Sequence, residues 1–374
     1  MVQDSGVTPS YATDGSPPPS LPVVPASAGT LSDGVDEDVD VLFHLGLRVP
    51  RSHGNGRCPP GTDDAVGLFG AVTHAVLCGS ASRARALAAA FAGPAGEGLD
   101  DFTRTDRYAL FRTAGGRVVV ASHGIGRPSV SVVLNELTKL FRYARAGNSQ
   151  VTKDAESSGE GVDCGTVNLP PVTYYRVGTC GGIGVPVGTL VLTSRVVDGQ
   201  LRGEATSTVL GVRRSEPAVF DEHVVAALAA YAQTEDWGGG GKADGRAGAP
   251  EAGSRVVVGT TATLDGFYEE QGRMDGASCS FDDARRTAWL RSAYDAGVRN
   301  FEMEGLEFAS FTHRHGIPAA MACVALINRL DGDQVTSPPA KIAACEADLI
   351  RLIVGFVRHR LEGEAAGATE ARAS

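Results

Sequence analysis

The chain has 374 residues, a length that fits one large domain or two ordinary ones. Hydrophobic residues make up 43% of it and charged residues 21%, which is an ordinary balance for a globular protein. The 34 basic and 44 acidic side chains give a formal net charge of −10, which argues against a nucleic-acid-binding protein because such proteins usually carry a basic stripe. No apolar run approaches the roughly 18 residues of a membrane-spanning helix, so no membrane association is expected.

The N-terminal segment and the cysteines indicate the compartment. The first residues contain neither the basic nor the apolar region of a secretory signal, so a cytoplasmic protein is expected. The seven cysteines are odd in number, are scattered and never occur as C-x-x-C. That pattern favours free thiols in a reducing compartment over a disulfide framework or a zinc ribbon, and no metal site is expected.

Composition divides the chain into one domain and several polar segments. Residues 1–36 are rich in Ser, Pro, Gly and Asp, which predicts a disordered tail because few apolar side chains are available to stabilise a fold. The domain is expected over 37–362, followed by a flexible C-terminal tail at 363–374. Three stretches inside the domain have the composition of loop insertions: 51–63, 149–170 and 236–254.

The rest of the chain alternates β-rich runs with helical periodicities. Apolar residues recur at helical spacing over 130–141, after the start signals Pro128 and Ser129, and again over 342–357. Such alternation predicts an α/β fold with a largely parallel or mixed sheet, whose ligands bind at the carboxyl ends of the strands. The β-rich runs are 73–78, 117–124, 172–178, 188–197, 254–259 and 319–328.

Two glycine-rich loops follow β-rich runs. One, RVGTCGGIG, covers 176–184, and the other, GIGRPS, covers 124–129. Backbone N–H groups in such loops can bind an anion. Neither loop has the sequence of a nucleotide-binding P-loop or of a dinucleotide-binding fingerprint. Ordinary turn chemistry explains each loop equally simply when it is taken alone.

Three arginines lie at or near predicted strand ends. Arg83 follows Gly79 where the first run ends, Arg107 precedes another strand, and Arg176 lies inside a strand. The planar guanidinium binds phosphate well because it offers parallel donors. A surface ion pair is the ordinary explanation for any one of them. Arg176 is the exception, because a charge in a buried strand is costly without a partner.

Two further segments carry polar side chains suited to a nucleoside. Gln271 and Arg273 are two residues apart in one loop, where an amide and a cation together suit the edge of a cyclic imide. Glu302 and Glu304 precede an apolar helix, and carboxylates commonly accept hydrogen bonds from the vicinal hydroxyls of a sugar. The alternatives are a polar connecting loop for the first pair and acidic residues that complement a helix dipole for the second.

Taken together, these segments resemble the uridine phosphorylase branch of the nucleoside phosphorylase family, and the animal-type enzymes most closely. The resemblance extends from about residue 40 to about residue 360. The matching stretches are DVLFHLGL (40–47), LCGSASR (77–83), TDRYALF (105–111), SHGIGRPSVSVVLNELTKL (122–140), RVGTCGGIGVPVGTLVLT (176–193), TLDGFYEEQGRMDGA (263–277), YDAGVRNFEMEG (294–305) and NRLDGDQ (328–334).

The resemblance implies a three-layer α/β/α domain around a mixed sheet that cleaves uridine reversibly with inorganic phosphate. The products are uracil and ribose 1-phosphate, and no metal or organic cofactor is required. Deoxyuridine and thymidine are further candidate substrates. The resemblance also implies a homodimer in which each subunit contributes residues to the other subunit's active site.

Residue by residue, the resemblance assigns three binding sets and a catalytic set. The phosphate set is Gly79, Arg83, Arg176, Thr179 and, from the neighbouring subunit, Arg107. The uracil set is Phe267, Gln271, Arg273, Leu326 and Ile327. The ribose set is Glu302, Met303, Glu304 and, again from the neighbouring subunit, His44 at the 5′-hydroxyl. The catalytic set is Arg83, Arg176, Thr179, Gln271, Arg273 and Glu304.

The chain departs from the family pattern at two positions, and two alternative functions remain open. Cys180 stands where the family usually has serine or an equivalent small residue, and Gly305 where it usually has serine, which predicts altered affinity rather than loss of activity. One alternative is a purine nucleoside phosphorylase or nucleosidase, with Asp331 or Asp333 as the acid that protonates the base. The other alternative is a nucleoside-binding protein without catalysis.

Overall fold

The computed structural model describes residues 39–50, 63–92, 98–146, 172–235 and 255–373. The described residues belong to one compact unit, Glu37–Ser374. The tail predicted at 1–36 and the insertions predicted at 149–170 and 236–254 lie outside the described residues, as does the insertion at 51–63 except for its last residue. Within the described ranges, no helix combines the length and the apolar composition required to cross a bilayer.

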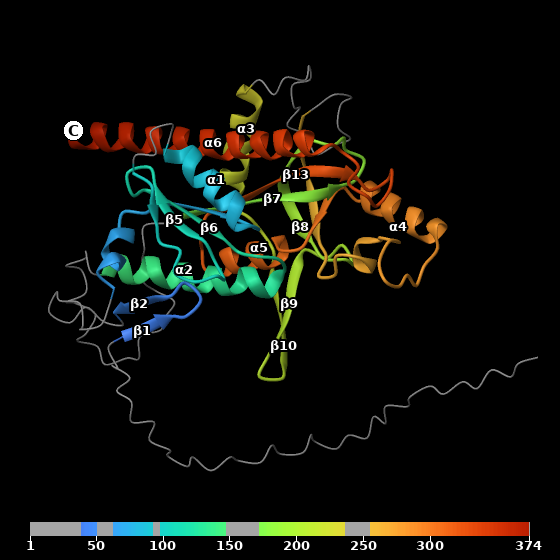
Figure 1. Cartoon of the computed structure of the whole chain (residues 1–374), viewed down its shortest axis with the longest axis horizontal. Coiled ribbons are helices and arrows are strands. Elements are labelled where there is room, and N and C mark those ends of the chain that lie inside the picture. Colours follow the sequence, from blue (N-terminus) through green and yellow to red (C-terminus); the bar gives the residue numbers. More distant parts are fainter. Residues whose placement is uncertain (1–38, 51–62, 93–97, 147–171, 236–254, 374) are drawn as a thin grey trace, which may run out of the picture. The chain divides into compact units, whose positions relative to one another are not determined.

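Strands and helices alternate along most of the described chain (Figure 1). In order they are β1 (Val39–Leu42), β2 (Leu47–Pro50), the 3₁₀ helix η2 (Asp64–Phe69), β3 (His74–Cys78), α1 (Ala81–Ala92), β4 (Asp100–Asp101), β5 (Leu110–Thr113), β6 (Val118–Ser122), α2 (Arg127–Ala146), β7 (Thr173–Gly182), β8 (Leu190–Val197), β9 (Glu204–Val209), β10 (Val212–Pro217), α3 (Glu222–Thr234), β11 (Val256–Thr263), the 3₁₀ helix η4 (Glu269–Gln271), α4 (Asp283–Asp295), β12 (Val298–Glu302), α5 (Gly305–Arg314), β13 (Ala319–Asn328) and α6 (Pro339–Ala373).

Nine of the described strands form a mixed sheet in the order β12-β11-β8-β13-β7-β3-β6-β5-β4. β3 is parallel to both β6 and β7, and β7 is parallel to β13, whereas β8 is antiparallel to β13. The last residues of β7 also pair antiparallel with β12, in the register Asn300↔Gly182 and Phe301↔Gly181. Strands β7, β13, β8, β11 and β12 therefore close on themselves, and this closure brings the ends of β7 and β12 together.

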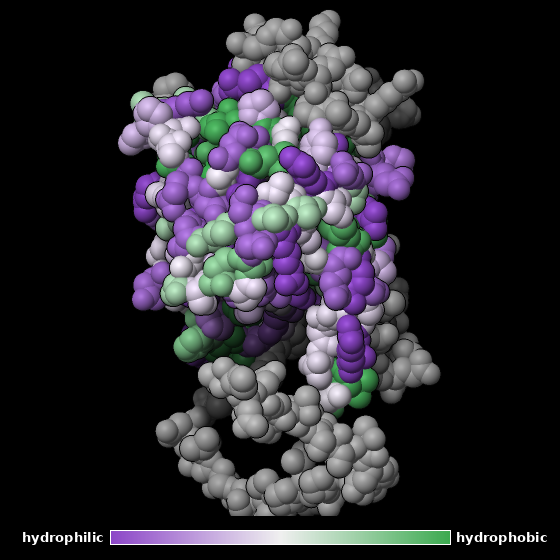
Figure 2. All heavy atoms as spheres, turned by 90° about the vertical axis from the view of Figure 1, so that its right-hand side faces the viewer, coloured by the Kyte–Doolittle hydropathy of each residue, from purple (hydrophilic) through white to green (hydrophobic). Residues whose placement is uncertain are grey.

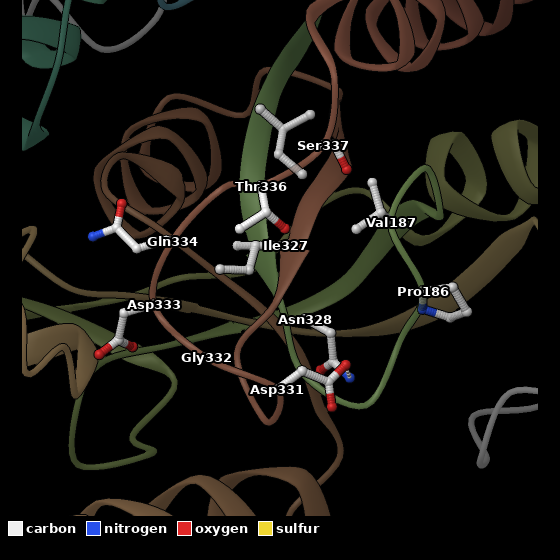
Figure 3. A pocket seen from close by; sticks show the side chains of 11 residues that line it. Pro186, Val187, Ile327, Asn328, Asp331, Gly332, Asp333, Gln334, Thr336 and Ser337 are labelled. Atoms are coloured by element: carbon white, nitrogen blue, oxygen red, sulfur yellow. Dashed lines mark hydrogen bonds between the residues drawn. The ribbon is translucent and has the colours of Figure 1, made fainter.

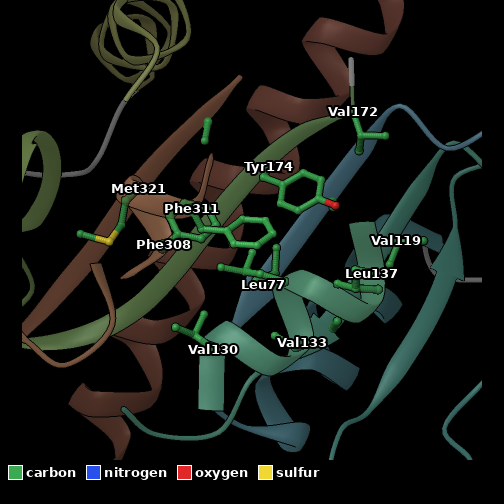
Figure 4. Close-up of a cluster of buried hydrophobic side chains, with 14 of the residues drawn as sticks. Leu77, Val119, Val130, Val133, Leu137, Val172, Tyr174, Phe308, Phe311 and Met321 are labelled. Atoms are coloured by element: carbon green, nitrogen blue, oxygen red, sulfur yellow. The ribbon is translucent and has the colours of Figure 1, made fainter. Parts of the chain in front are cut away.

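Helices α2 and α5 cover one face of the sheet. The apolar stripe predicted over 130–141 is buried along α2, and Figure 4 shows Val130, Val133 and Leu137 directed toward Leu77 and Tyr174 of the sheet. Helix α5 packs on the same face through buried phenylalanines. Burial of a side chain of this size contributes about 1.5–3 kcal/mol to the free energy of unfolding, so the stripe anchors the helix.

Helices α1, α3 and α6 cover the opposite face (Figure 1). Their apolar residues form a second buried cluster with the other faces of β3, β6, β7 and β13. Helix α4 lies beside β12 and packs on Phe301 and Ile183 in a third, smaller cluster. The predicted three-layer α/β/α arrangement around a mixed sheet is confirmed.

The C-terminal residues differ from the prediction. Residues 363–373, predicted to be a flexible tail, continue helix α6. Five of these eleven residues are alanine and two are glutamate, and both types are strong helix formers. Glu364 also joins the segment to the domain, because its carboxylate lies 2.5 Å from Arg117 Nη2 and 3.2 Å from Nε2 of the buried His74.

Two of the three glycines in helix α6, Gly355 and Gly363, have different surroundings, which allows a matched test of its packing on α3. A Cβ on Gly355 would collide with the Tyr231 hydroxyl and lie 3.2 Å from Tyr231 Cζ, whereas a Cβ on Gly363 would meet nothing within 4 Å. Both alanine substitutions gain the same helix propensity, so their difference isolates the collision. We expect Gly355→Ala to be less stable than Gly363→Ala by about 1–3 kcal/mol in urea unfolding. Equal stabilities would contradict this packing.

Candidate active site

The buried side chain of Arg176 on β7 is the centre of the site. Its Nη1 lies 2.9 Å from Glu302 Oε2, and its Nη2 is paired with Glu304 Oε2. Burial by itself lowers the pKa of this guanidinium, but Glu302 and Glu304 more than offset burial, and the pKa is raised. The partner that the sequence analysis required for this charge is thus a pair of carboxylates that the sequence places more than a hundred residues away.

Glu302 ends β12, and protein donors occupy its carboxylate. It accepts hydrogen bonds from Thr263 Oγ1 at 2.5 Å, from Glu304 N at 2.8 Å and from Gly305 N at 2.8 Å. Burial raises its pKa, and the charge of Glu304 adds to the rise, while Arg176 opposes it. This residue therefore holds the turn between β12 and α5 and orients Arg176.

Glu304 connects the Arg176 cluster to the second glycine loop. Its Oε1 accepts a hydrogen bond from Gly126 N at 2.6 Å, while its Oε2 pairs with Arg176. Gly126 has φ +87°, a conformation that side chains other than glycine rarely adopt. The two glycine loops, the acidic pair and Arg176 therefore form one cluster. Met303 lies between the two glutamates and is half-buried.

Gly79 and Arg83 lie where β3 ends and α1 begins. A Cβ on Gly79 would lie 3.9 Å from Arg83 Nη1 and 3.9 Å from Cε1 of His123. Arg83 Nη2 is 2.5 Å from Glu346 Oε1, a partner on α6 that the sequence analysis missed. Among the described residues, the buried Nε atoms of Arg83 and Arg176 have no hydrogen-bond acceptor, as is also true of Arg127 and Arg255; Arg83 and Arg176 are the pair whose charges both act on His123, beside Gly79. Buried donors are nearly always paired, so these two atoms are candidates for binding an anion.

Thr179 follows Arg176 on the same strand. It is half-buried and lies in register with Val324 of β13, three residues beyond the arginine. At this position β7 has already passed the end of β3, whose last residue pairs with Val177. Thr179 is therefore on the part of β7 that extends beyond the carboxyl end of β3, the edge of the sheet where ligands of α/β proteins bind.

The loop with Gln271 and Arg273 lies on η4 and the residues after it. Arg273 donates two hydrogen bonds to Asp275, at 2.8 and 2.5 Å, and its guanidinium lies 4.5 Å from the ring centroid of Phe267. The Phe267 side chain is 47% exposed. Gln271 is buried, and its carbonyl oxygen accepts a hydrogen bond from Arg329 Nη2 at 2.6 Å.

Arg329, Arg286 and Asp333 support this loop, and the sequence analysis assigned no such role to them. Asp333 lies 3.2 Å from Arg329 Nη1 and 3.1 Å from Arg286 Nη2, and it accepts a hydrogen bond from Met274 N at 2.9 Å. The one feature of the sequence that pointed to Arg329 and Asp333 was the NRLDGDQ stretch, which matches the family pattern. Asp333, the candidate acid of the alternative enzyme, is thus held by two cations.

Leu326 and Ile327, at the end of β13, line a cavity of about 340 Å³ that the loop 331–337 covers (Figure 3). Asn328 connects this cavity with the first glycine loop. Its Oδ1 accepts a hydrogen bond from Gly184 N at 3.0 Å, and its Nδ2 donates to Asp331 at 2.8 Å. Asp331, the other candidate acid, is therefore engaged with an amide.

His44 and Arg107, both assigned to a neighbouring subunit's site, are anchored to α2 rather than to the Arg176 cluster. His44 Nδ1 is 2.7 Å from Glu136 Oε1, and Arg107 Nη2 donates to Ser129 Oγ at 2.8 Å. Phe43, next to His44, has an exposed fraction of 75%.

The two departures from the family pattern are both next to Arg176. Cys180 is buried on β7, and burial raises the pKa of its thiol, so it is an inert packing residue. A Cβ on Gly305 would lie 2.8 Å from Glu302 Oε1 and 2.9 Å from Met321 Cε. Met321 also accepts a hydrogen bond on Sδ from Arg176 Nη1 at 3.0 Å. Its side chain fills the space that a serine at 305 would need.

Comparison with known proteins agrees with this geometry. A family profile described as Phosphorylase superfamily matches residues 73–358. The chain is 32% identical to mouse uridine phosphorylase 1 over 328 residues, covering 86% of this chain and 89% of the relative. It is also 32% identical over 303 residues to a Schistosoma mansoni protein named inactive uridine phosphorylase B, covering 80% of this chain and 85% of that one. Its fold is similar to a crystal structure of Schistosoma mansoni uridine phosphorylase in complex with thymidine, with a TM-score of 0.70, 29% identity, and coverage of 87% and 95% of the two chains.

The contact between Gly305 and Met321 predicts a coupled pair of substitutions. Gly305→Ser should lower the free energy of unfolding by about 1–3 kcal/mol, because its Cβ is too close to Met321. Met321→Leu removes the terminal methyl group, and it should recover at least about 0.5 kcal/mol of that loss in the double variant. Urea unfolding of both single variants and the double variant measures the coupling. Strictly additive losses would contradict the steric explanation.

Proposed function

The chain belongs to the phosphorylase superfamily, and on that premise we propose that it is a uridine phosphorylase. It cleaves the glycosidic bond of uridine reversibly with inorganic phosphate and yields uracil and ribose 1-phosphate. The observation that carries this proposal is the buried Arg176 held between Glu302 and Glu304, with the unpaired Nε donors of Arg176 and Arg83 beside it. The cluster combines donors for an anion with a carboxylate for a sugar hydroxyl.

Phosphate is proposed to bind at Gly79, Arg83, Arg176 and Thr179. It is already anionic at neutral pH, so it needs correct positioning more than activation by a general base. Cleavage builds positive charge on the ribose and negative charge on the uracil. Phosphate held by fixed arginines next to the ribose stabilises that charge in the transition state, without reorganisation at the moment of reaction. For the same reason we propose that the reaction requires no metal or organic cofactor.

The leaving uracil is proposed to bind Gln271 and Arg273 under Phe267. Gln271 offers both a donor and an acceptor, which suits the imide edge. Arg273 can donate hydrogen bonds to a carbonyl oxygen of the base and so stabilise the negative charge that develops there. Arg273 is at present paired with Asp275 through two hydrogen bonds, so the substrate has to replace that partner. For Leu326 and Ile327 the assignment to the base rests on the resemblance alone, because the cavity that they line does not include Gln271, Arg273 or Phe267.

We further propose a homodimer in which His44 and Arg107 of each subunit complete the other subunit's site. Apolar surface is available for it: Phe43 and Ile125 are each 75% exposed. Leu210, at the tip of the protruding β9–β10 hairpin, is 99% exposed, and Figure 2 shows hydrophobic atoms at that tip. Exposed apolar side chains of this size are typical of protein interfaces.

A cytoplasmic location is also proposed. The five cysteines in the described residues, among them Cys180 and Cys323, are all free thiols. Free thiols in this number are typical of a reducing compartment.

One second candidate has a specific observation in its favour. The carboxylate of Glu346 contacts Arg83, a residue that phosphate binding needs, and one similar protein is named as inactive. A nucleoside-binding protein without catalysis would fit both facts. We prefer the enzyme because every arginine assigned to phosphate is present.

The reaction is tested by following the ultraviolet absorbance of uridine with the purified protein. We expect loss of uridine only when phosphate is added, and no cleavage of inosine under the same conditions. Cleavage without phosphate would identify a nucleosidase and overturn the arginine assignment. Binding of uridine without any turnover would favour the second candidate.

Three alanine variants separate the two substrates. Arg83→Ala should raise the KM for phosphate about 10- to 100-fold and leave the KM for uridine nearly unchanged, because it removes hydrogen bonds to a charged group. Gln271→Ala should raise the KM for uridine and leave the KM for phosphate nearly unchanged. Arg85→Ala is the control, since Arg85 lies on the same helix but is exposed and paired with Asp101. Equal effects of Arg83→Ala on both KM values would contradict the assignment.

Shared sites predict complementation between two variants that are each impaired in phosphate binding. When Arg83→Ala and Arg107→Ala chains are co-expressed, each mixed dimer contains one site with both defects and one site with neither. We therefore expect the mixture to be more active than either variant alone. If Arg107 acted within its own chain, every site would keep one defect and no activity would return.

A further inference from the structure

His123 is a buried histidine that the proposed mechanism does not yet use. It follows β6 directly, and its backbone N donates to Cys78 O at 2.8 Å, which aligns it with Gly79 at the end of β3. Its ring is fully buried, and its Cε1 is 3.9 Å from the position of a Cβ on Gly79. The imidazole is therefore next to Gly79, one of the residues proposed to bind phosphate.

The hydrogen bond on one ring nitrogen determines what the other nitrogen can do. His123 Nδ1 lies 2.9 Å from the carbonyl oxygen of Gly124. A carbonyl only accepts, so Nδ1 must carry the hydrogen, and Nε2 of the neutral ring presents a lone pair. Burial, followed by the charge of Arg176, holds the pKa of His123 well below its usual range, which keeps the ring neutral.

That lone pair has no donor within the described part of the chain. Nε2 of His123 is buried and unpaired, and so are the Nε atoms of Arg83 and Arg176, whose charges both act on this ring. The cluster thus holds two unused donors and one unused acceptor. An oxyanion without any proton would accept hydrogen bonds from the two donors. It would also place a lone pair on one of its oxygens against the lone pair of Nε2, and two acceptors form no hydrogen bond.

We propose that His123 is a further phosphate-binding residue whose Nε2 accepts a hydrogen bond from the P–OH group of hydrogen phosphate. The inference rests on the proposed function. It assigns the protonated oxygen of the phosphate to His123, and its charged oxygens to the arginines and to the reacting carbon of the ribose. His123 thereby makes the site specific for an oxyanion that carries a proton.

Two dianions without a proton are suitable competitors. Sulfate has the charge and shape of hydrogen phosphate, and monofluorophosphate carries fluorine in place of the hydroxyl group. Above the second ionisation of phosphate, all three ions carry the same charge, so only the hydrogen bond distinguishes them. We expect the wild-type protein to bind hydrogen phosphate at least about tenfold more tightly than either competitor.

Two substitutions separate the two sides of the ring. The amide nitrogen of Asn in His123→Asn can still donate to Gly124 O, but no atom replaces Nε2. The longer side chain in His123→Gln places an amide group near the Nε2 position, and its oxygen can accept. His74→Asn is the matched control, because His74 is equally buried and neutral but begins β3, at the opposite end of the strand from Gly79.

The measured quantities are the KM for phosphate, the inhibition constants of both competitors and the KM for uridine. For His123→Asn we expect the KM for phosphate to rise about tenfold, with unchanged inhibition by sulfate and monofluorophosphate. His123→Gln should retain most of the selectivity, and His74→Asn all of it. Equal losses for all three ions in His123→Asn would show a purely structural role and overturn the proposal.

Two further measurements decide the question if a variant does not fold or if uridine is not cleaved. If His123→Asn does not fold, the wild-type protein alone decides, because binding of sulfate or monofluorophosphate as tight as that of hydrogen phosphate overturns the proposal. If uridine is not cleaved at all, calorimetric binding of the three ions measures the same selectivity without turnover. Failure of the proposed function and failure of this inference are thus distinguishable.

Discussion

The buried ion cluster of Arg176 with Glu302 and Glu304 constrains the rest of the molecule. Transfer of such charges from water into a protein costs several kcal/mol per ion, which is recovered only when every charge has well-placed partners. The three charged groups come from β7, from the end of β12 and from the start of α5. Loss of any one partner would leave an uncompensated buried charge, so these elements must be correctly placed together for the chain to fold.

The same requirement positions the site. Glu304 also holds Gly126, which ties the start of α2 to the cluster, and Glu302 holds the turn into α5. The side of the site proposed to bind the base is supported separately by Arg329 and Arg286, which share Asp333 and hold the backbone around Gln271. Functional side chains held by fixed partners in this way are preorganised, which is the condition for electrostatic stabilisation of a transition state.

Neighbouring residues in the cluster compensate one another. Met321 occupies the space beside Gly305 and accepts a hydrogen bond from Arg176, so the glycine and the methionine form one unit. Interiors are packed as densely as organic crystals, which is why a change at one of these positions requires a change at the other. Substitution of serine by glycine at 305 is therefore compatible with an intact arginine cluster.

Sequence patterns alone predicted six of the nine strands of the central sheet (β3, β6, β7, β8, β11 and β13), the apolar stripe of α2, the α/β class and the need of Arg176 for a partner, because these follow from local periodicity and from the cost of a buried charge. Only the tertiary structure decided that Glu302 and Glu304 are those partners, since the antiparallel pairing of β12 with the end of β7 joins segments far apart in the chain. The roles of Glu346, Asp333 and His123 were equally hidden: each depends on a neighbour from another element, and no local pattern encodes such a contact. Helix α6 was underestimated at its end, because the stabilising contact of Glu364 with Arg117 joins two distant segments.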